Sequence, residues 1–321
     1  MRSKLAAITI VVSILILCLS FNVSAQQKEL RFGYLVADQL HSPAVMIMKE
    51  KKMLEAEGFK VTWNEFLAGS YLMQFMTSGE VDFGSGGCVP AIITRGQGVD
   101  VVILAGANAE GSSIVVKDTI KKVTDLNGKN VGTPGIGSIQ DAMVDSLARG
   151  NKIKIIHKAM KVSDMPIFLQ KGEIDGFISW APHPARAVDL KYGYQILTSH
   201  DLMPDHQCCV LVSRESTLKK DPETARKVVK TYLKAYKWFL DNQKESIAMM
   251  AAATGMKEEV VLDAMKTVKY PFPPHVNMPS VKVMTEGLIQ TGKVEKDRVT
   301  DLDSFVKGIY KPEILEELLK Q

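Results

Sequence analysis

The sequence has few cysteines and lacks the short motifs of the common enzyme classes. Four cysteines are spread over 321 residues, which excludes a small scaffold held together by disulfides. The sequence contains no Gly-x-Ser-x-Gly, phosphate-loop, complete Gly-x-Gly-x-x-Gly, His-Glu-x-x-His or Cys-x-x-Cys pattern. Nothing therefore indicates a serine hydrolase, a nucleotide-binding enzyme or a regularly spaced metal site. The lysines are dispersed among acids without clustered arginines and aromatics, which argues against nucleic acid as a partner.

The remaining composition is that of an ordinary globular protein. Hydrophobic residues make up 46% of the chain and charged residues 24%, with 40 Lys and Arg against 36 Asp and Glu. This apolar content is enough to bury a core and excludes disorder. The length predicts two domains, or one domain in two lobes.

The first 25 residues are typical of an export signal. Arg2 and Lys4 precede an uncharged apolar run over 5–19, and small residues follow up to Ala25, after which we expect cleavage. A membrane span needs about 20 apolar residues, so the run is short for one. Cys18 follows a leucine where a bacterial lipidation signal has a small residue. We therefore expect a periplasmic protein without a lipid anchor.

The mature chain keeps three cysteines, Cys88, Cys208 and Cys209. This odd number leaves at least one thiol without a partner in the same chain. A disulfide between the adjacent Cys208 and Cys209 would close a strained ring. We therefore predict that these two side chains are small buried hydrophobic groups on opposite faces of a strand.

From residue 30 onward, short apolar runs alternate with segments of helical period, which predicts an α/β fold with largely parallel strands. The first series has strands at 30–36, 61–66, 81–84 and 99–105 and helices at 41–58, 71–78 and 89–96. The second has strands at 114–116, 131–133, 153–157, 174–179 and 195–198 and helices at 138–149, 165–171 and 185–192. Residues 205–212 are extended, and from 221 the pattern is helical, with Val228, Tyr232, Tyr236 and Phe239 on one buried face.

A repeat suggests that the two series share a plan. Phe75, Gly79, Glu80 and Asp82 recur in the same order as Phe168, Gly172, Glu173 and Asp175, at a constant offset of 168 − 75 = 93. Helix–glycine–strand joints are common in α/β chains, but the identical order favours two related lobes. We expect lobe 1 to begin at 26–110, lobe 2 to span 111–205, and 206–321 to return to lobe 1 and add C-terminal helices.

Facing lobes would line a cleft with the loops that follow the strands, where open α/β sheets bind ligands. Several of these loops begin helices with serine or glycine, as at Ser42, Ser70, Gly87 and Ser138, and none contains Lys or Arg. Helix N-termini present free amides and a positive dipole end. The cleft is therefore predicted to bind an anion through backbone amides and serine hydroxyls.

These motifs resemble those of a known family. The export signal, Gly69-Ser70, Gly79-Glu80-Val81-Asp82, residues 125–132 and Trp180-Ala181-Pro182 are similar to the solute-binding proteins of ABC importers, in the branch for nitrate, sulfonates, taurine and thiamine precursors. The resemblance implies a type II periplasmic-binding-protein fold, an ABC permease as partner, a monomer, closure on a small anionic or zwitterionic ligand, and no cofactor or catalysis. It implies ligand contacts at Asp38, Gln39, His41, Ser42, Gly69, Ser70, Gly86, Gly87, Cys88, Gly137, Ser138, Trp180 and His183.

Other interpretations remain open from the sequence. Asp38 or Asp205 could hold the ammonium of an aminosulfonate, and Trp180 with Tyr34 could stack on an aromatic ligand. A metal site among Asp38, His41, Cys88, His183, Asp205 and His206 lacks ligand spacing, so we expect His183 and His206 to donate hydrogen bonds to ligand or hinge backbone. An enzyme of the same fold, of menaquinone or thiamine-precursor synthesis, and a periplasmic sensor are the alternative functions.

Overall fold

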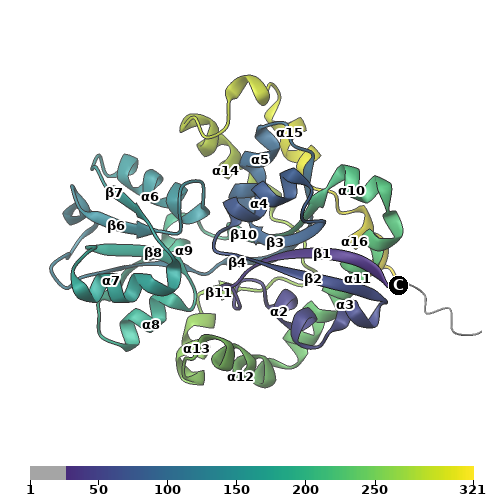
Figure 1. Ribbon diagram of the computed structural model, residues 1–321. Coiled ribbons are helices and arrows are strands. Elements are labelled where there is room, and N and C mark those ends of the chain that lie inside the picture. Colours follow the sequence, from purple (N-terminus) through teal and green to yellow (C-terminus); the bar gives the residue numbers. More distant parts are fainter. Residues whose placement is uncertain (1–26) are drawn as a thin grey trace, which may run out of the picture.

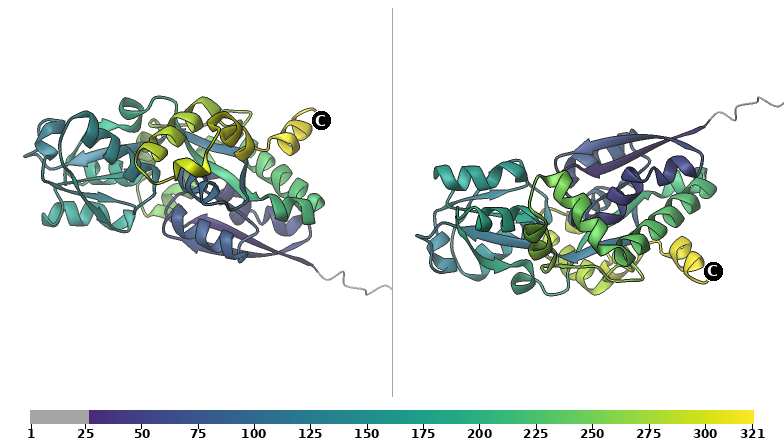
Figure 2. Two further views of the ribbon diagram at one scale, coloured as in Figure 1. Left: turned by 90° about the horizontal axis from the view of Figure 1, so that it is seen from above. Right: turned by 90° about the horizontal axis from the view of Figure 1, so that it is seen from below.

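The computed structural model describes residues 27–321, and the chain forms two lobes that lie side by side (Figure 1, Figure 2). The predicted signal, residues 1–25, lies outside the described residues. Each lobe is built on one β-sheet, of six strands in the first lobe and five in the second. Over residues 27–321, no helix has both the length and the apolar character needed to cross a membrane. The predicted α/β class is confirmed.

The first lobe has a sheet of strand order β11-β4-β10-β3-β1-β2. Its strands are β1 (Lys28–Leu35), β2 (Phe59–Phe66), β3 (Phe83–Gly87), β4 (Val101–Glu110), β10 (Gln207–Arg214) and β11 (Val268–Lys269). Its first helices are α2 (Pro43–Glu50), α3 (Met53–Ala56), α4 (Gly69–Ser78) and α5 (Cys88–Gly96). The single helix predicted over 41–58 is wrong in one respect: Lys52 adopts a left-handed conformation, with φ 50°, and separates α2 from α3.

The second lobe has a sheet of strand order β7-β6-β8-β5-β9. Its strands are β5 (Ser112–Val116), β6 (Asn130–Thr133), β7 (Ile156–Ala159), β8 (Gly176–Trp180) and β9 (Tyr194–Thr198). Its helices are α6 (Ile139–Gly150), α7 (Met165–Lys171), α8 (His183–Asp189) and α9 (Ser199–Leu202), with 3-10 turns at Val123–Leu126 and Val162–Asp164. Every residue of β5 and β8 is buried, so these two strands form the centre of the lobe.

Both sheets are mixed, although mainly parallel sheets were predicted. In the first sheet, β1, β2, β3 and β4 share a direction while β10 and β11 oppose them; in the second, only β5 opposes the other four. Strands β10 and β5 each follow a crossing from the other lobe. Ser112 pairs with Trp180 at the end of β8, and Gln207 pairs with Ala109 near the end of β4. A chain that enters a lobe at the carboxyl edge of its sheet must run antiparallel to it.

The repeated motif has the same structure in both lobes. In each copy a helix ends at a left-handed glycine, Gly79 with φ 83° and Gly172 with φ 81°. The carboxylate of Asp82 accepts a hydrogen bond from the Arg31 amide at 2.9 Å, and that of Asp175 accepts one from the Asn130 amide at 3.0 Å. Each aspartate therefore aligns the strand that follows it with the neighbouring parallel strand, as two lobes of related plan require.

The chain crosses between the lobes in two segments that carry strained backbone. Glu110 and Gly111, at the first crossing, have φ of 60° and 93°, and Asp205, at the second, has φ of 57°. The buried Glu110 carboxylate joins them by accepting hydrogen bonds from the Asp205 amide at 2.7 Å and from the Lys269 ammonium at 3.0 Å. Lys269 also pairs with Asp205 at 2.6 Å. We refer to these two crossings and the residues that join them as the hinge.

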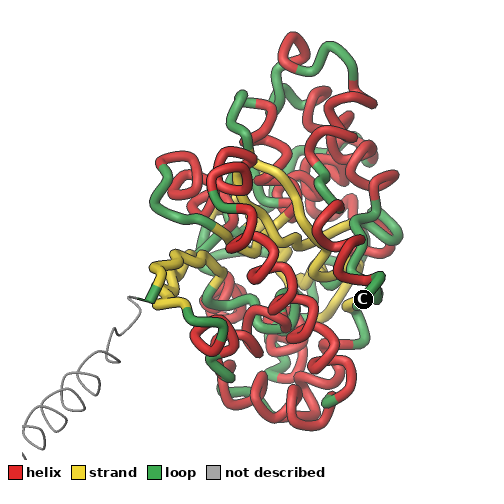
Figure 3. The backbone as a smooth tube through the Cα atoms, turned by 90° about the vertical axis from the view of Figure 1, so that its right-hand side faces the viewer, coloured by secondary structure: helices red, strands yellow, loops and turns green. Residues whose placement is uncertain are grey.

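The C-terminal portion is helical apart from β11, and in Figure 3 the helices surround the strands. It comprises α10 (Glu215–Lys220), α11 (Pro222–Asp241), α12 (Gln243–Thr254), α13 (Glu258–Met265), α14 (Met278–Gln290), the turn Lys296–Arg298, α15 (Leu302–Ile309) and α16 (Glu313–Leu319). The stripe predicted for α11 is confirmed, since Tyr232, Tyr236 and Phe239 are fully buried. This portion also reaches the second lobe, where α13 packs on α8 and α14 on α6 (Figure 1).

Candidate functional site

A small cavity lies between the lobes at the carboxyl ends of β1, β3 and β8. It is lined by Leu35, Asp38, His41, Ala68, Gly69, Gly87, Pro90, Ser138, Ile139, Gln140, Trp180, Cys208 and Cys209. Its volume is about 20 Å³, which is room for roughly one water-sized group. The two lobes therefore leave little free volume between them at this point.

Three helices begin at the wall of this cavity. Ala68 and Gly69 start α4, Gly87 precedes α5, and Ser138 and Ile139 start α6. The first amides of a helix have no intrahelical acceptor, and the dipole makes that end positive. No Lys or Arg lines the cavity. The wall therefore combines three positive helix ends with the carboxyl group of Asp38 and the thiols of Cys208 and Cys209.

The structure brings six of the thirteen predicted site residues to the cavity, namely Asp38, His41, Gly69, Gly87, Ser138 and Trp180. The other seven lie apart from it. Gln39 and Ser42 line a neighbouring pocket of about 140 Å³, and Ser70 and Gly137 line an open pocket of about 590 Å³. Gly86, Cys88 and His183 line neither, because Gly86 faces Leu72, Cys88 is fully buried in α5, and His183 contacts the opposite lobe.

Two of the serine hydroxyls predicted to bind the ligand, those of Ser42 and Ser138, form hydrogen bonds within the protein. Ser138 Oγ donates to the Gly135 carbonyl at 2.8 Å and accepts from the Asp141 amide at 3.1 Å, so it caps α6. Ser42 Oγ donates to Asp38 Oδ2 at 3.2 Å and lies 2.9 Å from Ser85 Oγ. Ser42 directly precedes α2, but its side chain makes no capping hydrogen bond. The two hydroxyls therefore hold the walls in place.

Four titratable side chains meet at one side of the cavity: Asp38, His41, Cys208 and Cys209. Cys208 Sγ lies 3.3 Å from His41 Nδ1 and 4.0 Å from Cys209 Sγ, and Cys209 Sγ lies 3.6 Å from Asp38 Oδ2. The prediction that the two thiols occupy opposite faces of a strand is wrong. The pairing of β10 with β4 shifts on both sides of Cys209, and Cys208 has no partner on β4. This bulge turns both sulfurs to one side.

The surroundings shift the pKa of each group in this cluster. A hydrogen bond from the Cys209 thiol, with the adjacent His41 ring, holds the pKa of Cys208 well below its usual value. The same hydrogen bond raises the pKa of the Cys209 thiol. Burial acts to lower the pKa of His41, but the charge and hydrogen bond of Cys208, the charge of Asp38 and the Gly111 carbonyl together outweigh burial and raise that pKa. Burial raises the pKa of Asp38 to about 7.

Two side chains of the second lobe bind one carbonyl of the first. Trp180 Nε1 donates to the Ala37 oxygen at 2.8 Å, and His183 Nε2 donates to the same oxygen at 3.2 Å. His206, the other predicted donor, gives Nδ1–H to the Met203 carbonyl at 2.7 Å next to the hinge. Burial lowers the pKa of His183 to about 4, so its ring is neutral at neutral pH. Ala37 is therefore a fastening point between the lobes.

An ion-pair network fastens the lobes a second time. Lys293, which follows α14, pairs with Asp141 at 2.7 Å and with Asp145 at 2.8 Å, both on α6. Asp141 also accepts from the Gly137 amide at 3.1 Å and lies 2.6 Å from His157 Nδ1. Lys293 lines the open pocket beside Gly137. A cation thus approaches the cleft from a remote segment, although the cleft loops contain none.

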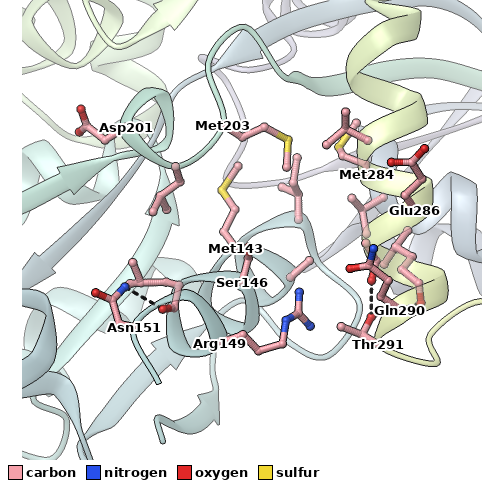
Figure 4. A pocket seen from close by; sticks show the side chains of 18 residues that line it. Met143, Ser146, Arg149, Asn151, Asp201, Met203, Met284, Glu286, Gln290 and Thr291 are labelled. Atoms are coloured by element: carbon pink, nitrogen blue, oxygen red, sulfur yellow. Dashed lines mark hydrogen bonds between the residues drawn. The ribbon is translucent and has the colours of Figure 1, made fainter. Parts of the chain in front are cut away.

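A larger pocket of about 420 Å³ lies behind α6, between this helix, α9 and α14. Met143 of α6 and Met284 of α14 line it from facing helices, and Met203, Arg149, Asn151 and Glu286 line it as well (Figure 4). None of the predicted site residues lines it. We therefore place the candidate site at the smaller cavity, where the helix starts and the titratable cluster meet.

Sequence reasoning missed several residues of the site. Cys208 and Cys209 were assigned to the core, and Gln140, Ile139 and Pro90 were not selected. Gln140 Nε2 donates to Ser112 Oγ at 2.9 Å, which ties the start of α6 to the first residue of β5. A signal was present for the cysteines, since the extended segment that carries them directly follows the second crossing. Of the residues considered for a metal, Asp38 and His41 meet, whereas Asp205 lies at the hinge.

Comparison with known proteins identifies relatives along most of the chain. The model of the NMT1-like family matches residues 24–254. The taurine-binding periplasmic protein of Escherichia coli (strain K12) is 25% identical over 272 residues, which cover 80% of this chain and 83% of that protein.

Solved structures share the fold. The periplasmic nitrate-binding protein NrtA from Synechocystis PCC 6803 superposes with a TM-score of 0.79 at 15% identity, covering 92% of this chain and 89% of that one. The periplasmic aliphatic sulphonate binding protein SsuA from Escherichia coli gives a TM-score of 0.67 at 20% identity, covering 87% of this chain and 99% of that one. The predicted two-lobed periplasmic-binding-protein fold is confirmed.

Proposed function

This chain belongs to the NMT1-like family, and from that membership and the cavity between its lobes we propose that it is the solute-binding component of an ABC importer. It captures a small anion of the sulfonate, taurine or nitrate type by closure of the lobes and delivers it to a permease. The solute leaves chemically unchanged. The observation that carries the proposal is the convergence of the starts of α4, α5 and α6 on one interlobe cavity.

The energetics require contacts from both lobes. A helix N-terminus contributes roughly 0.3–1 kcal/mol, and up to about 2 kcal/mol when partly buried, whereas micromolar affinity needs about 8 kcal/mol. Three helix ends alone therefore fall short, and direct hydrogen bonds from amides supply the difference. Gly69 and Gly87 contribute from the first lobe, and Ser138 and Ile139 from the second. A solute held by both groups stabilises the closed state.

The hinge and the contacts between the lobes also support the proposal that the lobes close on a solute. The Ala37 carbonyl and the Lys293 network join the two lobes in this arrangement. The solute shifts this equilibrium by its differential affinity, and moving from 1:99 to 99:1 needs about 5.5 kcal/mol. We further propose that the chain is exported with cleavage after Ala25 and acts in the periplasm as a monomer.

The test is direct titration of the purified exported protein with taurine, alkanesulfonates and nitrate by calorimetry. We expect one of these anions to bind with micromolar affinity and to be recovered intact by mass spectrometry. Conversion of the bound solute would instead support an enzyme, and absence of binding across the panel would refute the proposed ligand class.

A pair of variants locates the site. Ser138→Leu places a larger side chain in the cavity wall, so we expect solute binding to be lost. Ser70→Leu is the matched control, since Ser70 starts α4 but lines the outer pocket, and we expect it to keep its affinity. Thermal unfolding of both variants checks the fold, because Ser138 also caps α6. Equal loss in both variants would place the solute outside the small cavity.

A further inference from the structure

The cluster beside the cavity has the composition and geometry of a metal-binding site. We propose that His41, Cys208 and Cys209, with Asp38 at the fourth position, bind a thiophilic transition-metal ion, for which zinc is the probe. All four residues also line the small cavity, so metal binding is measured with no solute present and its outcome is separate from that of the anion titration. It revises the expectation from sequence, where ligand spacing was absent and no metal site was predicted.

The distances between the ligand atoms fit a tetrahedral ion. Zinc bonds of about 2.3 Å to sulfur and about 2.0 Å to nitrogen require edges of roughly 3.8 Å between two sulfurs and roughly 3.6 Å between sulfur and nitrogen. The two sulfurs are 4.0 Å apart, and Cys208 Sγ is 3.3 Å from His41 Nδ1. All three ligand atoms lie within 4.8 Å of one another. Two of the three edges thus match a tetrahedral ion to within a few tenths of an ångström, and the third, between Cys209 and His41, is at most 4.8 Å long.

The carboxylate of Asp38 lies next to this set and is the candidate fourth ligand. Its Oδ2 lies 3.6 Å from Cys209 Sγ, and its Oδ1 lies 4.0 Å from His41 Nδ1. Asp38 is only 2% exposed, yet its Oδ1 has no hydrogen-bond partner. A buried polar atom without a partner is costly and calls for an explanation. A cation between the carboxylate, the imidazole and the thiols supplies the missing contact.

The contacts behind the ligands orient them for a metal. His41 Nε2 lies 3.0 Å from the Gly111 carbonyl, which can only accept, so Nε2 carries the proton. In the neutral ring the lone pair is then on Nδ1, the atom that faces the sulfurs. Asp38 Oδ2 is held by Ser42 Oγ at 3.2 Å. Such outer contacts, a carbonyl behind a histidine and a hydroxyl behind a carboxylate, are typical of metal sites.

The chemistry of the donors selects the class of ion. Two thiolates and an imidazole favour zinc or another thiophilic transition metal over magnesium or calcium, which prefer oxygen ligands. On binding, each thiol releases its proton to solvent as the sulfur–metal bond forms, and no oxidant or reductant is needed. The cluster is nearly excluded from water, with exposures of 0% for His41, 1% for Cys208 and 4% for Cys209. Exchange of the ion therefore accompanies opening of the lobes.

The experiment uses the purified exported protein, treated with chelator under reducing conditions and then titrated with zinc chloride against a chromophoric chelator. We expect one zinc per chain by elemental analysis and a melting temperature that rises with zinc concentration. Cobalt as a second probe should give sulfur-to-metal charge-transfer absorption. Cys208→Ser and Cys209→Ser should each weaken zinc binding by at least the roughly 10- to 100-fold known for loss of an outer contact.

Cys88 provides the matched control. It is also a fully buried thiol without a disulfide, but it lies in α5 outside the cluster. Cys88→Ser should therefore keep full zinc affinity and the cobalt absorption. Asp38→Asn adds a variant that removes no sulfur and should keep the absorption while losing part of the affinity. The proposal is overturned if the reduced wild type, with three thiols counted, binds no zinc, or if the double variant Cys208→Ser/Cys209→Ser binds it equally well.

Discussion

The shared acceptor at Ala37 allows a sharp test of how the lobes are held closed. Trp180 and His183 donate to the same carbonyl oxygen, at 2.8 Å and 3.2 Å. Removing either donor leaves the oxygen with the other, so each single change costs only the net value of one hydrogen bond, about 0.5–1.5 kcal/mol. Removing both leaves a part-buried carbonyl without either donor, which costs up to about 1–3 kcal/mol more.

We therefore expect Trp180→Phe and His183→Phe to be non-additive. The double variant should lose roughly 1–2 kcal/mol beyond the sum of the singles, a further 5- to 30-fold shift toward the open state. The cycle cancels local effects of each change, such as the smaller ring at position 180 or the buried Nδ1 of His183, which has no partner.

The assay is single-molecule energy transfer between dyes on exposed positions of the two lobes, recorded without solute so that no ligand contact enters. Calorimetry on a solute that binds the wild type gives a second readout, because apparent affinity falls with the closed fraction. Additivity within about 0.3 kcal/mol would refute the idea that Ala37 fastens the lobes, as would variants that unfold earlier but close normally.

Three further predictions follow from the backbone, the repeat and the buried imidazole. Gly111→Ala should lower the melting temperature more than Gly128→Ala in a thermal scan. Both glycines are left-handed, with φ 93° and 73°, and left-handed strain alone costs about 1–2 kcal/mol. Only at Gly111 would the added Cβ also meet another atom, His41 Nε2, at 2.5 Å. Asp82→Asn should lower the free energy of unfolding in urea more than Asp175→Asn does, each by about 1–3 kcal/mol. The reason is that Arg31 donates to both carboxylate oxygens of Asp82, at 3.0 and 2.5 Å. Equal losses in the two variants would contradict this. Burial lowers the pKa of His183 from its usual 6.5 to about 4. The contribution of the neutral His183 ring to closure should therefore be complete above pH 6.5 and weaken as the pH falls toward 4. The difference in closed fraction between wild type and His183→Gln isolates this contribution, and a difference that does not vary with pH would contradict it.

The sequence alone predicted the parts of the fold that depend on local patterns. Strand and helix segments alternate as expected through both lobes, and the glycine–aspartate repeat marks the same joint twice because the signal is local. Asp82 and Asp175 have one structural role in the two lobes, which the constant offset anticipated. The starts of α4, α5 and α6 were likewise visible as small residues after apolar strands.

The predictions that were wrong concern residues whose contact partners are distant in sequence. The common orientation of Cys208 and Cys209 comes from a bulge set by the register of β10 against β4, which no local pattern contains. The hydroxyls of Ser42 and Ser138 looked free for a ligand because their acceptors and donors are fixed only in the fold. Lys293 reaches α6 from more than a hundred residues away along the chain.

The Gly111 carbonyl belongs to the crossing segment, yet it accepts the imidazole N–H of His41 at 3.0 Å and the Ala181 amide at 2.8 Å. A rotation of one lobe against the other at this crossing turns the Gly111 peptide plane. The His41 ring must then tilt with it, or the hydrogen bond between them breaks. The hinge and the small cavity are therefore connected through one hydrogen bond, without intervening side chains. The peptide unit of Gly111 thus belongs to the crossing segment and also contacts a residue that lines the cavity.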